Sequence, residues 1–328
     1  FLLDVRDALA VTSSGDRLHM QSQQAVAVEL GLADPEELLR HTYLAGRKIA
    51  YTSELTWYRL NQLLAQEKPG LRSLVPRLRG GSKQVREPLA EGVVDSGSEI
   101  TLARNADLSS DPGLLLRVAG ASAAFQKPIA PVVLESAIAT RAPWNREMRE
   151  SFVSLLGAGP GLLSTWEALD QHGIIEAWFP EWVRLRSAPQ FNALHEYTVD
   201  RHLIECVLQS QAFVRKVDRP DLLLVAALLH DIGKCQEGDQ SEIGAHMTRV
   251  IAPRIGFDLE DTEVLERLVL HHLLLPDIAT KRDLDDPDVI SGVADAVKDT
   301  RTLELLLALS VSDSRATGPS LRSKWRES

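Results

Sequence analysis

Apolar residues recur every three or four positions along most of the chain, a spacing that predicts helices over nearly its whole length. Near the start, Val5 and Leu9 fall on one helical face. An Asp-Pro-Glu-Glu sequence at Asp34 is a strong helix start, with an N-cap aspartate followed by proline and acids. This helix is predicted to run to about Ala65, and we expect its aromatic residues, Trp57 among them, to pack in the core or between helices.

The helical pattern breaks between Lys68 and Leu89, where prolines and glycines are mixed with arginines and lysine. This basic stretch is predicted to be a loop. Residues 91–103 contain two short apolar runs around a Ser-Gly-Ser sequence and predict a small β-hairpin. Helical spacing resumes at Asp111, and a connector rich in tryptophan follows, whose aromatic side chains we expect to be buried.

The pattern therefore predicts an all-α protein with one small β-hairpin. Residues 1–143 are expected to form a helical domain with the basic loop and the hairpin. Residues 144–190 are expected to form a helical connector, and residues 191–328 a second helical domain.

Composition narrows the class of protein. The chain has 328 residues, 44% of them hydrophobic, and a formal net charge of −10, which argues against a nucleic-acid partner. It contains no apolar run long enough for a membrane span. Two cysteines cannot form a disulfide framework, so we expect a cytoplasmic location. Phe1 begins without methionine inside a helical pattern and reads as an internal residue of a longer chain.

A His-Asp pair at the end of an apolar run is the main chemical signal. His230 and Asp231 follow eight consecutive apolar residues, and His202 and Asp313 lie in other predicted helices. A lone His-Asp pair most often packs or caps a helix. Here, four residues could bind one metal ion: His202, His230, Asp231 and Asp313. Two imidazoles and two carboxylates suit Mn²⁺, Fe²⁺, Zn²⁺ or Co²⁺, and Mg²⁺ less naturally.

A metal ion bound in this way, with open positions, suits hydrolysis at phosphorus. Lys234 follows in a Gly-Lys turn and is predicted to stabilise charge that develops on a phosphate. His272, in a His271-His272 doublet, is a second candidate for this role. His195 shares a helical face with His202 and is either a wall of the site or a structural histidine.

These residues resemble the H…HD…D signature of the HD superfamily of metal-dependent phosphohydrolases, which has an all-helical fold. More specific segments resemble the HD domain of bifunctional uridylyltransferase/uridylyl-removing enzymes, which modify the PII nitrogen signal protein. They are residues 192–202, the His230-Asp231-Ile232-Gly233-Lys234 sequence, residues 271–277, residues 282–287 and residues 312–319.

The resemblance implies an HD domain over residues 191–328 and Mg²⁺ or Mn²⁺ as cofactor. It also implies catalytic roles for Asp231, Lys234 and His272, and hydrolysis that releases UMP, or AMP, from a tyrosine of PII. The chain shows no Gly-Ser motif with paired aspartates, as in the nucleotidyltransferase core, and no glutamine-sensing ACT domains.

One departure from that family concerns a second metal ion. Relatives tend to have Asp-His-Ser-Glu after the Gly-Lys turn, whereas this chain has Gln240 in place of the histidine. A second metal site would be built from Gln240 with His271 or His272, and glutamine is a weak ligand. Two alternatives stay open. One is an HD phosphohydrolase that acts on free nucleotides, and the other, which Gln240 makes credible, is an HD regulatory scaffold with weakened catalysis.

Overall fold

The computed structural model describes residues 1–13, 15–67, 86–137, 143–191, 196–283 and 285–317. The first half contains these elements: α1 Leu2–Thr12, α2 Met20–Glu29, α3 Pro35–Glu67, β1 Glu87–Ala90, β2 Val93–Asp95, β3 Ile100–Leu102, α4 Leu114–Phe125, α5 Pro131–Glu135, α6 Arg146–Leu156, α7 Gly161–Gln171, α8 Ile174–Trp178 and α9 Trp182–Leu185.

The second half is helical throughout its described residues. Its elements are α10 Val199–Ser210, the 3₁₀ helix η1 Gln211–Phe213, α11 Pro220–Leu229, α12 Gln240–Arg254, α13 Leu259–Leu270, α14 Leu274–Lys281, α15 Pro287–Val297 and α16 Thr300–Thr317. Within the described residues, no helix is both long and apolar enough to cross a membrane.

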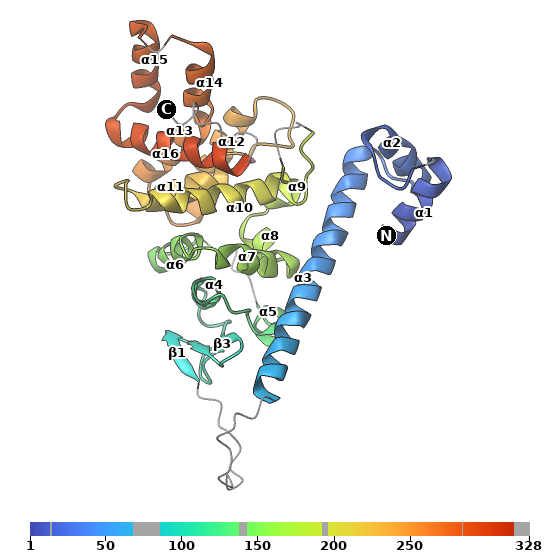
Figure 1. Cartoon of the computed structure of the whole chain (residues 1–328). Helices are drawn as coiled ribbons and strands as arrows, with labels where there is room; N and C mark the ends of the chain where they lie inside the picture. The colour runs from blue at the N-terminus through green and yellow to red at the C-terminus, as the bar shows by residue number, and fades with distance from the viewer. Residues whose placement is uncertain (14, 68–85, 138–142, 192–195, 284, 318–328) are drawn as a thin grey trace.

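The main body is a stack of layers (Figure 1). The sheet and α4 lie at one end, followed by α6 to α8, then by α10 and α11, and then by α13 and α16. Helices α14 and α15 project from the far end, and α3 runs along one side of the stack. From the sheet to α13 the layers follow the order of the chain, whereas α16, the last helix, returns to lie against α10 and α11.

The small sheet has three antiparallel strands, in the order β1-β2-β3. The predicted hairpin is present as β2 and β3, with Val93 opposite Leu102. The prediction missed β1, which pairs Glu87 with Asp95 in a stretch that we predicted to be loop. This strand is short, mostly exposed and contains Pro88, so it carries no alternating apolar pattern. The remainder of the predicted basic loop, residues 68–85, lies outside the described residues.

One continuous hydrophobic core extends from the sheet to α16, through residues such as Val93, Phe152, Leu228 and Leu309. The prediction that the tryptophan-rich connector is buried is confirmed, because Trp166 and Trp182 lie with ring centroids 5.3 Å apart in this core. A second, smaller core joins α1, α2 and the start of α3.

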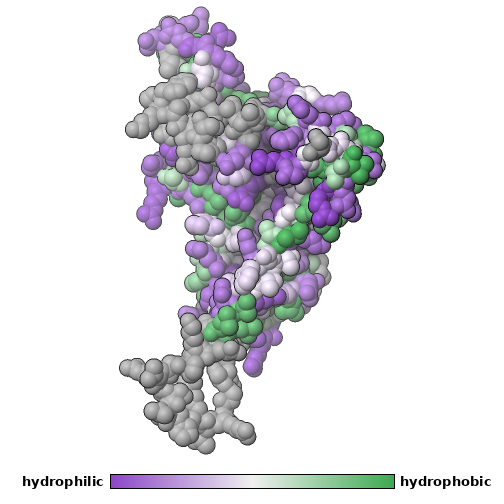
Figure 2. All heavy atoms as spheres, turned by 45° about the vertical axis from the view of Figure 1, so that its right-hand side comes forward, coloured by the Kyte–Doolittle hydropathy of each residue, from purple (hydrophilic) through white to green (hydrophobic). Residues whose placement is uncertain are grey.

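The expectation that the α3 aromatic residues are buried is wrong for Trp57, whose side chain is 61% exposed. Ile49 and Leu63 of the same helix are also exposed, and Figure 2, which brings the α3 side forward, shows hydrophobic side chains on the surface. The inner face of α3 instead contacts the body through polar groups, such as the Tyr58 hydroxyl, which donates to the Ser98 carbonyl at 2.6 Å. Amphipathic spacing alone does not reveal which apolar side chains of α3 are exposed, because Leu38 near its start is buried whereas Trp57 is not.

Candidate metal centre

Helix α10 supplies the first candidate ligand. Val199, Leu203 and Val207 are buried in the main core, and the same face of α10 buries His202. The Val199 N–H donates to the Ala188 carbonyl at 3.0 Å, which fixes the start of α10 against the preceding loop. His202 therefore sits on a helix whose direction is set by apolar packing.

Helix α11 brings the second and third candidate ligands, His230 and Asp231, to the site. Leu222 to Leu229 are all buried, so the helix runs through the middle of the core and brings His230 and Asp231 to its C-terminal end. Gly233, four residues after the end of this helix, lies directly against the first turns of α12. A Cβ on Gly233 would stand 2.1 Å from the Gln240 carbonyl oxygen and 2.5 Å from the Gly244 nitrogen. Only glycine allows this close approach of two backbones.

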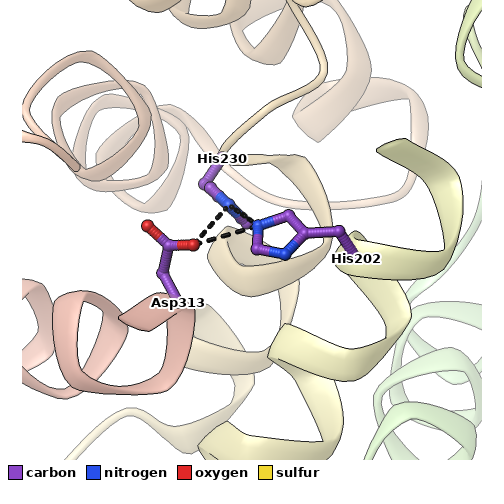
Figure 3. Close-up of side chains that lie close together, drawn as sticks. All are labelled: His202, His230 and Asp313. Atoms are coloured by element: carbon purple, nitrogen blue, oxygen red, sulfur yellow. Dashed lines mark hydrogen bonds and ion pairs between the residues drawn. The ribbon is translucent and has the colours of Figure 1, made fainter. Parts of the chain in front are cut away.

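Helix α16 supplies the fourth candidate ligand, Asp313. Asp299 caps its N-terminus, accepting from the Thr302 N–H at 2.8 Å and from the Thr302 hydroxyl at 3.0 Å. The helix packs along α10 and α11, with Leu305 and Leu309 buried, and this packing brings Asp313 to the two histidines. Figure 3 shows His202, His230 and Asp313 converging from three helices.

The ligand atoms of the four predicted metal-binding residues lie close together. The Nε2 atoms of His202 and His230 are 3.2 Å apart. Asp313 Oδ1 lies 3.0 Å from the His202 Nε2 and 3.6 Å from the His230 Nε2. Asp231 Oδ2 lies 3.6 Å and 3.4 Å from the same two nitrogens. The structure thus brings together the full predicted set.

The carboxylates of Asp231 and Asp313 and the imidazole of His230 shift one another's pKa values. Burial acts to lower the pKa of His230, but Asp231 and Asp313 outweigh it, so this pKa is raised well above its usual value. Burial likewise opposes ionisation of Asp231, yet His230 and Lys234 lower its pKa. The pKa of Asp313 is also lowered, because hydrogen bonds from both imidazoles overcome burial. The pocket therefore favours a positive charge between its carboxylates.

This donor set fits a divalent cation. His230 Nδ1 lies 2.9 Å from the Ala227 carbonyl and acts as a donor to it, which leaves Nε2 free to bind a metal ion. The ligand atoms of His202, His230 and Asp313 all lie within 4.8 Å of one another. A cation would satisfy the negative carboxylates that otherwise hold a proton on His230. Two imidazoles with carboxylates suit Mn²⁺, Fe²⁺, Zn²⁺ or Co²⁺ better than Mg²⁺.

Lys234 lies at the edge of this centre. Its Nζ lies 2.7 Å from Asp231 Oδ2 and donates to Gln190 Oε1 at 2.8 Å. The side chain of Lys234 is 16% exposed, compared with 5% for Asp231 and 17% for Asp313, so Lys234 and Asp313 are the members of the cluster that reach solvent. Sequence reasoning missed Gln190, which stands in a loop 44 residues earlier and has no motif of its own.

The structure separates the two histidines of the doublet. His272 is buried, and its Nε2 lies 3.6 Å from Asp231 Oδ1. His272 Nδ1 faces the Val269 carbonyl at 2.7 Å, and burial with the neighbouring His230 lowers the pKa of His272. His271 instead lines a surface pocket of about 540 Å³ beside Arg267, and burial and Arg267 lower its pKa. Of the two, only His272 contacts the centre among the described residues.

Two further candidates have different outcomes. Gln240 is half-buried in the first turn of α12, and within the described part of the chain its side chain makes no hydrogen bond. A second metal ion that uses Gln240 stays a prediction. His195 lies outside the described residues.

Cys206, one turn after His202, is buried, and burial raises the pKa of its thiol, so it forms a neutral wall behind His230.

Comparison with known protein families identifies the class of domain that carries this site. Residues 199–300 match the HD domain family, and His202, His230, Asp231 and His272 fall inside this match. The chain therefore contains an HD domain, and the predicted fold class, mainly α-helical with a small sheet element, is confirmed. Asp313 lies thirteen residues beyond the end of the match, on the helix that completes the cluster.

Curated relatives make the assignment more specific. The whole chain is 48% identical to a region of the bifunctional uridylyltransferase/uridylyl-removing enzyme of Streptomyces coelicolor and 41% identical to that of Mycobacterium tuberculosis. A relative of the same name from Corynebacterium glutamicum is 32% identical over 97% of the chain. The chain spans about 40% of the length of the first two relatives and corresponds to their HD-containing region.

Proposed function

We propose that this chain hydrolyses a phosphodiester and removes UMP, or AMP, from a modified tyrosine of a PII signal protein. The convergence of His202, His230, Asp231 and Asp313 carries this proposal. The HD domain match and the uridylyl-removing relatives support the class of reaction. The parent reaction of nucleotidyl transfer, and control by glutamine, would belong to other parts of a longer protein of this kind.

A bound divalent cation would supply positive charge to a phosphoryl oxygen and lower the pKa of a water molecule. The residues of this chain fix the geometry for that chemistry. Ala227 orients the His230 ring, and the cores of α10 and α16 hold His202 and Asp313. A water oxygen then bonds to phosphorus while the bond from phosphorus to the tyrosine oxygen breaks. The tyrosine oxygen takes a proton, and UMP leaves as the second product.

Lys234 and His272 act on the substrate side of the cluster in this proposal. The Lys234 ammonium is placed to contact a non-bridging phosphate oxygen, where its charge stabilises the developing negative charge. Burial and the neighbouring His230 lower the pKa of His272 and so favour its neutral ring, whose Nε2 can accept a proton near Asp231. Both roles depend on contacts that already exist within the cluster.

The test is direct hydrolysis. The protein is incubated with Mn²⁺ or Mg²⁺ and with uridylylated PII, adenylylated PII and a panel of free nucleotides, and UMP or AMP release is followed by chromatography. Release from modified PII that disappears in His230→Ala and Asp231→Ala supports the proposal. Turnover of free nucleotides alone would instead favour a nucleotide phosphohydrolase. Absence of turnover on every substrate, with metal bound, would favour a regulatory scaffold.

A further inference from the structure

We propose that Gln190 is a positioning residue that holds the Lys234 ammonium toward the phosphate-binding side of the metal centre. This inference rests on the proposed phosphodiester chemistry and adds to it a residue that lies before the HD domain match. Gln190 comes nine residues before the HD domain match begins at residue 199. It is therefore an element of the site contributed by the preceding loop.

Lys234 contacts one metal-ligand candidate and one neutral amide. Its Nζ has two partners among the described residues, Asp231 Oδ2 at 2.7 Å and Gln190 Oε1 at 2.8 Å. An ammonium group has three N–H donors, so these two contacts leave one donor for a ligand. The side chain is 16% exposed, so a ligand can approach Lys234 from solvent.

Gln190 is itself held in one orientation. Its Nε2 donates to the Tyr197 carbonyl at 3.1 Å, so its Oε1 is the atom that faces Lys234. The Ala188 carbonyl accepts from the Val199 N–H at 3.0 Å and ties the same loop to the start of α10. The amide of Gln190 is thus a fixed acceptor and not a mobile surface group.

The contact has a consequence for charge at the centre. Without Gln190, Lys234 would have only the carboxylate of Asp231 as a partner, and the ion pair would draw its ammonium toward the metal ligands. A neutral amide shares the ammonium without adding a second negative charge to the site. Gln190 thereby keeps Lys234 oriented while Asp231 remains available to a cation.

A double-mutant cycle tests the inference. The four proteins are the wild type, Gln190→Met, Lys234→Met and the double variant, with Gln209→Met, on the half-buried face of α10, as the matched control. Methionine keeps the length of glutamine and removes the acceptor. We expect Gln190→Met to lower kcat by about 10–100-fold, the usual effect of removing an outer-shell partner. We also expect the metal content of Gln190→Met to be unchanged. Adding Gln190→Met to Lys234→Met should cause no further loss of kcat. Gln209→Met should behave as wild type.

Additive losses in the cycle would show that Gln190 acts independently of Lys234 and would overturn the inference, as would normal kcat in Gln190→Met. The urea midpoints of the same four proteins test the contact without catalysis. Coupled residues predict that the double variant loses less than the sum of the two single losses, and additive midpoint shifts would refute the contact. If the wild type hydrolyses no phosphodiester, the proposed function fails, and the midpoints still decide whether Gln190 positions Lys234.

Discussion

Arg47 of α3 donates to Asp200 of α10 at 2.6 Å, and Asp200 stands two residues before the candidate metal ligand His202. The same guanidinium donates to Glu167 at 2.6 Å and to Asp170 at 3.0 Å. Although burial opposes its charge, Asp200 and Glu167 raise the pKa of Arg47, so it is permanently charged. One side chain from α3 thus joins that helix to the start of the helix that carries the first ligand.

Removing this charge should loosen α3 from the body. Arg47→Ala removes the cation that Asp200 and Glu167 contact and leaves Asp170 with Arg186 alone, and loss of one partner of a largely buried pair costs about 3 kcal/mol. We expect that decrease in the free energy of unfolding, measured with urea, and faster proteolytic cleavage within α3. Arg59→Ala removes a more exposed pair with Glu99 and should cost less than about 1 kcal/mol. Equal effects of the two substitutions would contradict the assigned role of Arg47.

The metal-binding prediction concerns three helices at once. Substituting alanine for His202, His230 or Asp313 removes a ligand atom from a cluster that lies within 4.8 Å. Because even outer-shell changes cost about 10–100-fold in metal affinity, each should cost at least about 100-fold, measured by calorimetry with Mn²⁺ and by metal analysis. His246→Ala, on the exposed side of α12, is the matched control and should bind metal normally. Normal metal content in all three variants would exclude this site.

The contact of Gly233 with α12 predicts a large steric effect from one methyl group. Gly233→Ala places a Cβ 2.1 Å from the Gln240 carbonyl, so α12 or the turn must move, at a cost of about 3 kcal/mol or more. Urea unfolding measures the loss of stability. Gly292→Ala in α15, where a Cβ meets nothing within 4 Å, should instead stabilise by about 0.5–1 kcal/mol. A neutral Gly233→Ala would show that the two backbones are farther apart.

The N-cap of α16 gives a pH-dependent prediction. The hydrogen bond from the Thr302 N–H is the main cause of the lowered pKa of Asp299. A carboxyl whose folded-state pKa is lowered stabilises the protein fully above its unfolded value near 4 and loses this contribution as pH falls through the folded-state pKa. Asp299→Ala should cost about 1 kcal/mol at pH 7, measured by urea unfolding.

Asp299→Asn separates the cap from the charge. Asparagine is also a good N-cap, so this variant should retain most of the stability at pH 7. Its stability relative to wild type should rise as pH falls below about 4, because wild type alone loses the carboxylate contribution. A difference between the two proteins that stays constant down to pH 3 would argue against a titrating cap at Asp299.

The sequence by itself determined the helical class, the position of the hairpin and the metal-binding candidates. Helix boundaries follow local spacing and caps, which are properties of a few neighbouring residues. His202, His230, Asp231 and Asp313 stand out because their residue types recur at the ends and faces of predicted helices. The resemblance to HD domains then linked four positions that are far apart in the chain, and the structure brings those four together.

Only the tertiary structure decided which side chains from distant parts of the chain contact one another. The contact of His272 with the centre, and the position of His271 at a surface pocket, depend on how α13 ends against α11 and α16. The link of Gln190 to Lys234 joins residues 44 positions apart, and no local pattern encodes such a contact. The exposure of Trp57 and the ion pair between Arg47 and Asp200 likewise depend on how α3 lies against the rest of the chain. Local sequence sets the elements, whereas packing between distant segments selects which side chains meet.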